Sequence, residues 1–420
     1  MSEQFKKEAA GFAALGLAHE TLATLSRNGY TVPTPIQIAA IPAVLGGRDI
    51  VGIAQTGTGK TLAFSLPLVE RMLAGQVKRA LIIAPTRELA LQIDETLQKV
   101  AQPRGVRSTV VIGGASMNNQ RDELGRRPRI VVATPGRLLD HMSQGLKLTE
   151  FDAVVLDEAD RMLDMGFAPS IKKILAGLPQ KRHTMLFSAT FPSDIEAIAA
   201  TYQRDPIRVE VASAGTATEL VEQELRLVAQ EEKGSLLGEI LADHDGTTLV
   251  FARTRHGARK LARVVRNFGH TAAELHSDRS LAQRKAALEA FKRGEVRVLV
   301  ATDIAARGID VKGIGLVVNY DLPDNPEDYV HRIGRTGRAG ASGRAVTFAL
   351  AEQERDVRDI EKTMRLSIPR APGTPATFGK PQEQIRRPSA KSRPAAPARP
   401  AGGPAKPAGG PAKFHSRRPR

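Results

Sequence analysis

Short apolar runs alternate with helix-like stretches along most of this 420-residue chain, and no other feature limits the fold as strongly. In the first half, the apolar runs fall at residues 50–54, 80–84, 109–112, 130–133, 153–156 and 185–187. The pattern restarts at residues 248–251, 271–275, 296–301, 314–319 and 345–348. Strands that alternate with helices, such as the one expected at 88–100, form parallel sheets covered by helices. The sequence therefore predicts an α/β protein with two parallel-sheet domains in tandem, at residues 1–210 and 221–370. The small, polar segment 211–220 is the predicted linker.

The composition excludes several classes of site and of cellular location. There is no cysteine, so structural disulfides, thiolate metal sites and a cysteine nucleophile are excluded. No apolar run approaches the roughly 18 residues of a membrane span, and residues 1–10 lack the apolar core of a signal peptide. We therefore expect a soluble, cytoplasmic protein with no membrane partner.

Residues 371–420 differ from the rest of the chain in composition and charge. They hold 11 of the 26 prolines and a tandem repeat, PAGGPAK, at residues 400–406 and 407–413. They also hold eleven Lys and Arg residues against one acidic residue, which is +10 of the net charge of +16. A segment this poor in apolar side chains cannot offset its ordering entropy, so we predict a disordered basic tail. Nucleic acid is the favoured partner of such a tail, and a solvated tail that only aids solubility is the alternative.

The segment that follows the first apolar run has the pattern of a phosphate-binding loop. It comprises Ala54, Gln55, Thr56, Gly57, Thr58, Gly59, Lys60 and Thr61. The glycines let backbone N–H groups turn toward phosphates, Lys60 adds a positive charge, and the Thr61 hydroxyl can ligate Mg²⁺. The first position of the usual G-x-x-x-x-G-K-[ST] pattern is alanine here. The alternative, a flexible loop between a strand and a helix, does not require Lys60 and Thr61 in this register.

An acidic cluster of Asp157, Glu158 and Asp160 follows the apolar run at residues 153–156. The carboxyl ends of parallel strands lie at the sheet edge where open α/β folds bind ligands. Carboxylates at that edge can hold Mg²⁺ through water and can orient a second water for attack. The alternative is an acidic first turn of the next helix. Together with the phosphate loop, the cluster predicts a Walker A and Walker B pair, and therefore a nucleoside triphosphatase.

These motifs, with others spread over residues 10–370, resemble those of the DEAD-box RNA helicases, superfamily 2 ATPases built from two RecA-like domains. The matches, in family order, are YTVPTPIQ at 30–37, the loop at 54–61, PTRELA at 85–90, the glycine pair at 113–114, TPGR at 134–137, DEAD at 157–160, SAT at 188–190, residues 250–255, ATDIAARGID at 301–310 and HRIGRTGR at 331–338. The PTPIQ and AAIPAVLGGRDI segments, the compact core and the basic tail look most like bacterial RhlE-type members.

The resemblance implies an ATP site that both domains complete. Tyr30 offers an aromatic face to adenine, Gln37 offers a side-chain amide to its N6/N7 edge, and Asp310 resembles the residue that holds the ribose. Arg335 and Arg338 resemble arginine fingers that reach the γ-phosphate when the domains close. From the residues alone, Tyr30 could equally pack on a neighbouring proline, and Gln37 could be an ordinary first-turn helix residue.

The resemblance also implies coupling residues and contacts with the RNA backbone. Ser188 and Thr190 would tie the acidic cluster to domain closure, although they could also be a helix N-cap pair. The implied RNA contacts are Thr86, Arg87, Gly114, Thr134, Gly136 and Arg137 in the first domain and Arg253, Arg284, Thr302 and Gly308 in the second. Donors of this kind suit phosphate and sugar, which carry no base sequence, and each residue taken singly also fits a turn or a cap. Because Leu281 occupies the position of the family's glutamine, only Arg284 is carried over from that motif.

These observations predict an ATP-dependent RNA helicase in which ATP and RNA together close the two domains. Glu158 would orient the attacking water, Asp157 would hold Mg²⁺ through water, and Lys60 and Thr61 would hold the phosphates and the metal. Ribosome-assembly or RNA-decay proteins are candidate partners. Two alternatives stay open: an ATP-gated RNA clamp or annealing factor, which the basic tail would favour, and a DNA-directed translocase.

Overall fold

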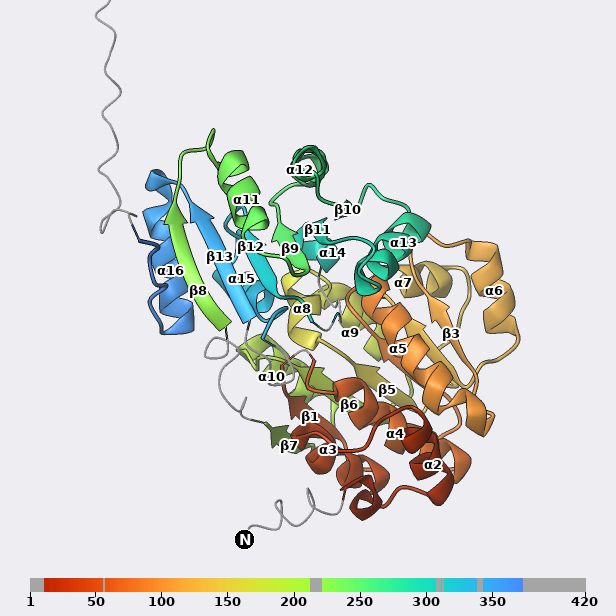
Figure 1. The fold of residues 1–420 in the computed structure, drawn as a ribbon. Helices are drawn as coiled ribbons and strands as arrows, with labels where there is room; N and C mark the ends of the chain where they lie inside the picture. Colours follow the sequence, from red (N-terminus) through yellow and green to blue (C-terminus); the bar gives the residue numbers. More distant parts are fainter. Residues whose placement is uncertain are drawn as a thin grey trace, which may run out of the picture. The chain divides into compact units, whose positions relative to one another are not determined.

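The computed structural model describes residues 11–55, 57–211, 221–306, 311, 313–337 and 343–372. Within these ranges the chain forms two parallel sheets, one in residues 50–210 and one in residues 221–349, and helices pack on both faces of each (Figure 1). The predicted fold class is therefore confirmed. Apart from Val211, Ala371 and Pro372, the predicted linker and tail lie outside the described residues.

Seven strands of the described chain form the first sheet, in the order β3-β4-β2-β5-β6-β1-β7, and each neighbouring pair is parallel. They are β1 (Ile50–Ile53), β2 (Ala80–Ile83), β3 (Ser108–Val111), β4 (Ile130–Ala133), β5 (Ala153–Leu156), β6 (His183–Ser188) and β7 (Ile207–Glu210). One face is covered by α3 (Pro35–Leu45), α4 (Lys60–Leu73) and α5 (Arg87–Val100). The other is covered by α7 (Pro135–Ser143), α8 (Ala159–Asp164), α9 (Ala168–Ala176) and α10 (Ser193–Tyr202). The shorter elements are η1 (Gly11–Leu15), α2 (His19–Arg27), η2 (Gln102–Arg104) and α6 (Met117–Gly125).

Six strands of the described chain form the second sheet, also parallel throughout, in the order β10-β11-β9-β12-β13-β8. They are β8 (Val221–Leu227), β9 (Thr248–Phe251), β10 (Ala272–Leu275), β11 (Val298–Ala301), β12 (Leu316–Asn319) and β13 (Gly343–Ala349). One face is covered by α11 (Lys233–Ala242) and α12 (Arg255–Asn267). The opposite face is covered by α13 (Leu281–Lys292), α14 (Asp303–Ala306), α15 (Pro326–Ile333) and α16 (Glu354–Met364), with η3 (Ala351–Gln353) before α16.

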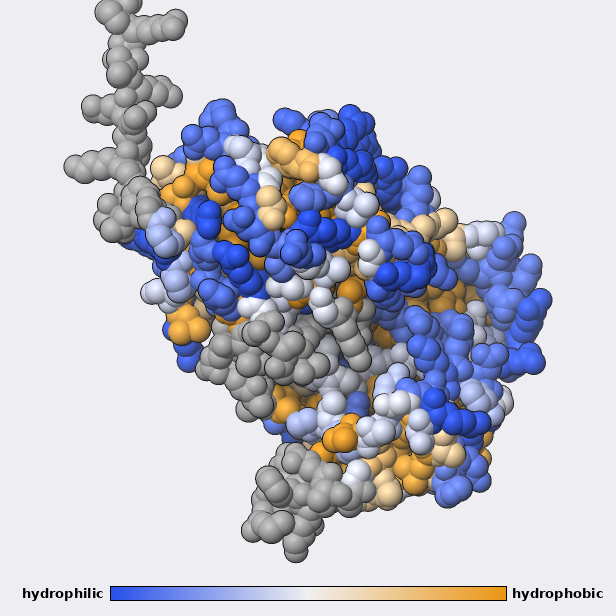
Figure 2. Space-filling view, in the orientation of Figure 1, coloured by the Kyte–Doolittle hydropathy of each residue, from blue (hydrophilic) through white to orange (hydrophobic). Residues whose placement is uncertain are grey.

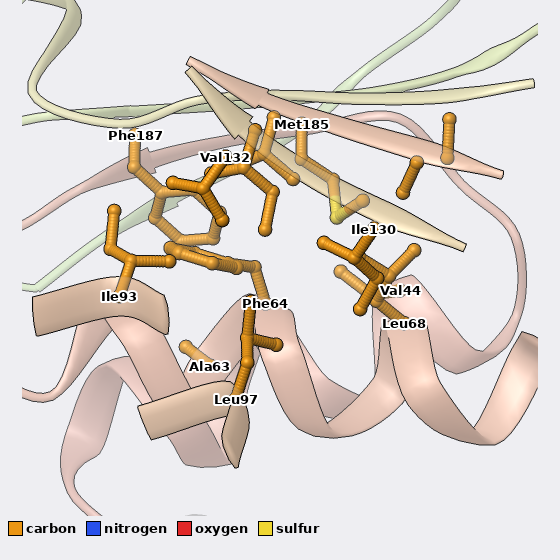
Figure 3. Packing of buried hydrophobic residues seen from close by; sticks show 14 of the residues in the cluster. Val44, Ala63, Phe64, Leu68, Ile93, Leu97, Ile130, Val132, Met185 and Phe187 are labelled. Atoms are coloured by element: carbon orange, nitrogen blue, oxygen red, sulfur yellow. The ribbon is translucent and has the colours of Figure 1, made fainter. Parts of the chain in front are cut away.

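Burial on both faces explains why most strands read as continuous apolar runs. All four residues are buried in each of β1, β2, β4 and β5. Between the first sheet and α3, α4 and α5, Phe64 packs against Phe187 with ring centroids 5.4 Å apart and planes inclined by 52° (Figure 3). Gly52 of β1 lies under the Phe187 ring, where a Cβ would come within 2.7 Å of ring carbons. This packing fixes β1, and with it the start of the phosphate loop.

The sequence prediction omits two strands, β7 and β8, and each is at an edge of its sheet. Their sequences, IRVE and VEQELRL, mix charged and apolar residues. An edge strand is paired along one side and can carry exposed charges, and a search for apolar runs passes over an edge strand that does so. None of the helices within the described ranges is both long enough and apolar enough to cross a bilayer.

Candidate nucleotide-binding and nucleic-acid site

The loop at residues 54–59 connects β1 to α4, as the phosphate-loop pattern predicts. Gly57 and Gly59 have φ angles of 88° and 89°, in the left-handed region that favours glycine. A Cβ at Gly59 would also collide with the side-chain amide of Gln37. Glycine is therefore required at this turn, which brings the loop to the N-terminus of α4, a place suited to phosphate. Thr56 lies outside the described residues.

Two polar side chains of the loop are held by its own backbone. The Thr58 hydroxyl donates to the carbonyl of Gln55 over 2.7 Å, and Nζ of Lys60 donates to the carbonyl of Ala54 over 2.8 Å. Lys60 is buried, yet it lines a cavity together with Thr61. Its charge is therefore directed at a pocket instead of at bulk water.

Gln37 joins α3 to the phosphate loop. It lies in the first turn of α3, as the alternative interpretation of this residue predicts, and it is buried. Its Oε1 accepts the backbone N–H of Thr34 over 2.9 Å, and its Nε2 donates to the carbonyl of Gly59 over 3.0 Å. The amide has a second N–H and a second lone pair with which to meet a base edge. Gln37 therefore supports the loop whether or not it also binds adenine.

The cavity beside the loop has a volume of about 430 Å³. Its lining includes Tyr30, Gln37, Gly57, Gly59, Lys60, Thr61, Asp157 and Glu158. Tyr30 also packs, partly buried, against an apolar cluster formed by η1, α2, α3 and α4. The structure thus brings most of the predicted nucleotide-binding residues to one concave site of the size typical of small-molecule pockets.

The carboxylates that follow β5 are buried, with Asp157 and Glu158 each 2% exposed. Burial raises the pKa of Asp157 to about 7; the charge of Lys60 opposes this shift, and the charge of Glu158 adds to it. A cation bound next to Asp157 would favour its charged form. The electrostatics of the cluster therefore fit a site that receives positive charge.

Glu158 has φ 52° and ψ 52°, a left-handed conformation that costs a residue with a side chain on the order of 1 kcal/mol. It is the N-cap of α8, and Nη1 of Arg161 lies 3.4 Å from its Oε2. Backbone strain of this kind persists where the surrounding structure fixes it, often at functional sites. Here it accompanies a buried carboxylate that lines the cavity.

Asp160 connects the acidic cluster to the segment after β6. It lies in the first turn of α8, but its Oδ2 accepts the N–H groups of Ala189 (2.9 Å) and Thr190 (2.8 Å) and the Thr190 hydroxyl (3.1 Å). The Ser188 hydroxyl oxygen accepts the N–H of Asp160 over 3.2 Å. Neither hydroxyl caps α10, whose N-cap is Pro192, so the helix-cap alternative is wrong. The sequence could not tell that the Thr190 hydroxyl would contact the Asp160 carboxylate and the Ser188 hydroxyl the Asp160 backbone.

Two arginines of the HRIGRTGR segment, Arg332 and Arg335, are buried. Arg335 is buried, and its Nε donates to the carbonyl of His331 over 3.2 Å. Arg332, to which the sequence analysis gives no role, is 2% exposed and donates from Nε and Nη2 to the two oxygens of Asp303, over 2.5 and 2.7 Å. Three predicted site residues of the second domain, Gly308, Asp310 and Arg338, lie outside the described residues.

Helix N-termini bring the predicted first-domain RNA contacts to the carboxyl edge of the first sheet. Thr86 is the N-cap of α5, Thr134 is the N-cap of α7, and Gly136 is in the first turn of α7. The Thr86 hydroxyl accepts the N–H of Leu89 over 3.2 Å. Thr86 is therefore a helix cap, as the alternative interpretation predicts, and it still lies beside the other candidates.

Two arginines, Arg87 and Arg137, lie near these helix N-termini. The Arg87 guanidinium lies against Gly114, which has φ 81° and where a Cβ would collide with it. Nη1 of Arg137 donates to the carbonyl of Ala115 over 2.9 Å. Burial, and then the charge of Arg137, lower the pKa of Arg87. Partly buried like charges in such proximity favour an anion beside them, and phosphate suits guanidinium groups.

Among the second-domain candidates, two make local contacts at the carboxyl edge of the second sheet. Nε of Arg253 lies 3.4 Å from the carboxylate of Asp324, and both groups are well exposed. The N–H of Thr302 donates to the carbonyl of Leu275 over 3.2 Å, directly after β11. Both residues are thus at the strand ends where the sequence analysis expects RNA contacts.

Arg284 of α13 is engaged by the protein itself, because it forms an ion pair with Glu88 of α5. Burial, and then the charge of Arg87, lower the pKa of Arg284 to about 10. Leu281, which occupies the family's glutamine position, packs against the apolar cluster of the first sheet. The family resemblance implies an RNA contact for Arg284, and no local sequence pattern indicates this pairing with Glu88.

The two parallel sheets, the phosphate loop and the buried carboxylates together define a P-loop nucleoside triphosphatase with two RecA-like domains. Residues 34–198 match the family model described as DEAD/DEAH box helicase, and residues 232–340 match the helicase conserved C-terminal domain. The chain is 42% identical over 355 residues to the ATP-dependent RNA helicase DbpA of Bacillus subtilis, which is 84% of this chain and 74% of that protein.

The chain is also 41% identical over 362 residues to the DEAD-box ATP-dependent RNA helicase CshA of Geobacillus kaustophilus, covering 86% and 78% of the two proteins. A structure of S. cerevisiae Dbp5 bound to RNA and ADP BeF3 matches with a TM-score of 0.76 at 30% identity, over 86% of this chain and 95% of that one. The chain therefore belongs to the DEAD-box family of ATP-dependent RNA helicases, as its motifs indicate.

We expect Gln37→Ala to lower ATPase activity and to erode the preference for ATP over GTP. Loss of a donor–acceptor pair at a base edge typically costs ~1–3 kcal/mol. Gln37→Glu is the matched control, since it can still accept the N–H of Thr34 but cannot donate to Gly59 or to adenine N7. The measurement is kcat/KM for both nucleotides. Parental ATP hydrolysis by Gln37→Ala, with GTP still rejected, would mean that adenine is read elsewhere.

Proposed function

We propose that this chain uses ATP binding to grip RNA and thereby separates short RNA duplexes locally. The observation that carries the proposal is the contact of Asp160 with Ala189 and Thr190, which links the acidic cluster at the nucleotide cavity to the segment after the neighbouring strand. A change at the nucleotide is then passed to that segment through hydrogen bonds, and the arginines Arg87 and Arg137 lie at the same edge of the same sheet.

The proposed chemistry assigns one task to each residue. Lys60 holds the phosphates, Glu158 orients the attacking water, and Arg335 with Arg338 stabilises the charge that develops on the transferred phosphoryl group. Mg²⁺, bound by Thr61 and through water by Asp157, would supply neutralising charge on the phosphates. Within the described residues no group of three or more His, Asp or Glu side chains is arranged to hold a metal. One carboxylate, water and phosphate oxygens are the usual surroundings of Mg²⁺ in such sites.

The test compares ATP hydrolysis and strand separation by the full chain. We expect hydrolysis to be stimulated by RNA and not by DNA of the same sequence, and ATP to accelerate displacement of a short RNA strand. Stimulation by DNA would favour a DNA-directed translocase. RNA-stimulated hydrolysis without strand displacement, accompanied by faster annealing, would favour an ATP-gated clamp.

We further propose that the chain is of the RhlE type and acts with ribosome-assembly or RNA-decay proteins. The support for the subfamily is sequence alone, namely the PTPIQ and AAIPAVLGGRDI segments and the basic tail. Crosslinking the full chain to cellular RNA and sequencing the bound fragments would test the proposal. Precursor ribosomal RNA or decaying messengers are the expected targets, and enrichment of neither would contradict it.

Deletion of residues 373–420 is expected to raise the RNA concentration that half-saturates the ATPase and to leave the saturated rate near its full-length value. The deletion begins after Pro372 because Ala371 is buried and donates its N–H to the carbonyl of Leu225 over 2.9 Å. The deleted segment carries +10 of the net +16 charge. If it contacts about three or four phosphates, the slope of log affinity against log salt should fall by about 2–3 units.

The effect of this deletion should be uniform across RNA sequences, because phosphate contacts carry no sequence information. An unchanged salt slope would show that the tail is only a solvated appendage. A lower saturated rate would show that it takes part in the catalytic cycle.

A further inference from the structure

Helix α12 carries a row of positive charge that nothing on the helix balances. Its sequence, RHGARKLARVVRN, holds Arg255, Arg259, Lys260, Arg263 and Arg266 and no acidic residue. Its apolar residues pack against the second sheet, so the cations lie on the outward side, and all but the half-buried Arg259 are exposed. The helix is seen end-on at the top of Figure 1, and the surface around it in Figure 2 is largely hydrophilic.

This arrangement is electrostatically unfavourable for the helix alone. Arg255, Arg259 and Arg263 are spaced four residues apart, where like charges destabilise a helix. Arg255 is also in the first turn, where the helix dipole disfavours a cation. The carboxylate of Asp278 neutralises part of this charge, because its oxygens lie 2.7 Å from Nη1 of Arg255 and 3.5 Å from Nη2 of Arg259. Lys260 and Arg263 have no ion pair or side-chain hydrogen bond with any part of the chain that the structure describes.

Helix α16 shows that such a row is not general for exposed helices of this protein. Its sequence, ERDVRDIEKTM, alternates the two signs. Arg358 lies 2.6 Å from Glu354, and Arg355 lies 4.0 Å from Asp359, both at favourable four-residue spacings. Helix α16 balances its charges within itself, whereas α12 does not. We therefore expect the charge of α12 to be neutralised by a polyanion from outside the chain.

The row begins where the proposed RNA contacts of the second domain lie. β9 ends at Phe251, and α12 begins at Arg255, two residues after the candidate residue Arg253. At 1.5 Å of rise per residue, the row from Arg255 to Arg266 extends roughly 16 Å. That length matches about five phosphates of one stacked nucleic-acid strand.

We propose that α12 is a second RNA-binding surface, along which a strand leaving the carboxyl edge of the second sheet places its phosphates on Lys260, Arg263 and Arg266. The inference rests on the proposed function, because the strand must first be bound at the sheet edge. The contacts are to the backbone and carry no base sequence. They lengthen the RNA site beyond the residues that the helicase motifs supply.

The test uses the full chain with Lys260→Glu and Arg263→Glu combined. Arg355→Glu combined with Lys362→Glu on α16 is the matched control, since it makes the same change in net charge on exposed residues of the opposite face of the same sheet. Two lost phosphate contacts should lower the salt slope for a long oligouridine by about 1.4 units. At about 0.1 M salt, its affinity should fall on the order of ten- to thirtyfold. The control should stay within about twofold of the parent, as expected where no phosphate is contacted.

A short oligouridine distinguishes the RNA site at the sheet edge from the α12 surface, because it is too short to reach both. At about eight nucleotides, within the range of one single-strand site, it should bind the α12 variant as tightly as the parent and stimulate ATP hydrolysis equally. The variant should also be at least as thermally stable as the parent, because a glutamate at position 263 faces Arg259 one turn away. If the Lys260→Glu, Arg263→Glu variant does not fold, Lys260→Gln with Arg263→Gln removes only the positive charge. It should weaken binding of the long oligouridine in the same way.

The outcomes distinguish this inference from the proposed function. Parental affinity of the α12 variant for the long oligouridine would overturn the inference alone, as would an equal loss in the α16 control. Weaker binding of the short oligouridine by the α12 variant would also overturn the inference, since the residues would then belong to the main RNA site. A salt-sensitive acidic protein partner bound to α12, with unchanged RNA affinity, would assign the surface to protein. Absence of RNA-stimulated hydrolysis in the parent would overturn the proposed function itself.

Discussion

Glu158→Gln should bind ATP with parental affinity while its rate of hydrolysis falls by about 10²–10⁴-fold. Glutamine has the size of glutamate but can neither accept a proton from the attacking water nor orient it through a charged oxygen. The substitution also removes one of the charges that raise the pKa of Asp157, so that pKa should fall from about 7. Single-turnover hydrolysis and equilibrium binding of a fluorescent ATP analogue measure the two effects separately.

With ATP present, the Glu158→Gln variant should also leave RNA slowly, since hydrolysis no longer resets the open state. Lys60→Ala is the informative contrast, because it removes a phosphate contact that exists before the reaction and should weaken ATP binding itself. RNA-stimulated turnover near the parental rate in Glu158→Gln would show that another group orients the water.

Arg332→Met should destabilise the second domain by about 3 kcal/mol or more. Arg332 is 2% exposed and pairs with both oxygens of Asp303, and its Nη1 donates to the carbonyl of Asp321 over 2.6 Å. Methionine fills much of the same space but leaves the Asp303 carboxylate and the Asp321 carbonyl without this donor. Denaturant unfolding, followed by hydrogen exchange in α15, measures the loss in the element that holds Arg332.

A double-mutant cycle shows whether the loss comes from the unpaired carboxylate. Arg332→Met combined with Asp303→Leu removes both charges, and replacing a largely buried pair by apolar residues is often near neutral. The double variant should therefore recover a large part of the stability. Arg332→Lys should be intermediate, because it keeps the charge but loses the fork that meets both carboxylate oxygens. Equal destabilisation in the single and double variants would mean that packing of Arg332 over Phe251, and not the ion pair, supplies the stability.

The sequence predicts the strands that are buried on both faces and fails at one edge of each sheet. β1, β2, β4 and β5 are apolar throughout because helices cover them on both sides, so composition alone reveals them. Strand β7 carries an Arg208–Glu210 pair, and β8 carries an Arg226–Glu224 pair. These charges are compatible with a strand only because it lies at an edge, and edge position is a property of the whole sheet.

At the candidate site, the sequence identifies residue types but not the contacts among them. The phosphate loop and the acidic cluster are recognisable because their spacing follows from local backbone geometry. The three hydrogen bonds accepted by Asp160 join segments 29 and 30 residues apart, and no local pattern specifies them. The same holds for Arg332, which is one of three arginines within HRIGRTGR and becomes distinct only through its burial against Asp303.

The outer side of β8 is an edge at which this protein could associate with another molecule. An edge strand presents unpaired N–H and C=O groups that can template pairing with a strand of another molecule. Here the N–H of Leu225 donates to the carbonyl of Pro369 over 2.7 Å and its carbonyl accepts the N–H of Ala371, so a short stretch of chain covers the middle of the strand. The charges of Glu222, Glu224 and Arg226 discourage pairing over the rest. Removal of residues 369–371, by truncation or by a protease, would therefore leave the enzyme prone to strand-mediated aggregation, even with every residue assigned to ATP or RNA intact.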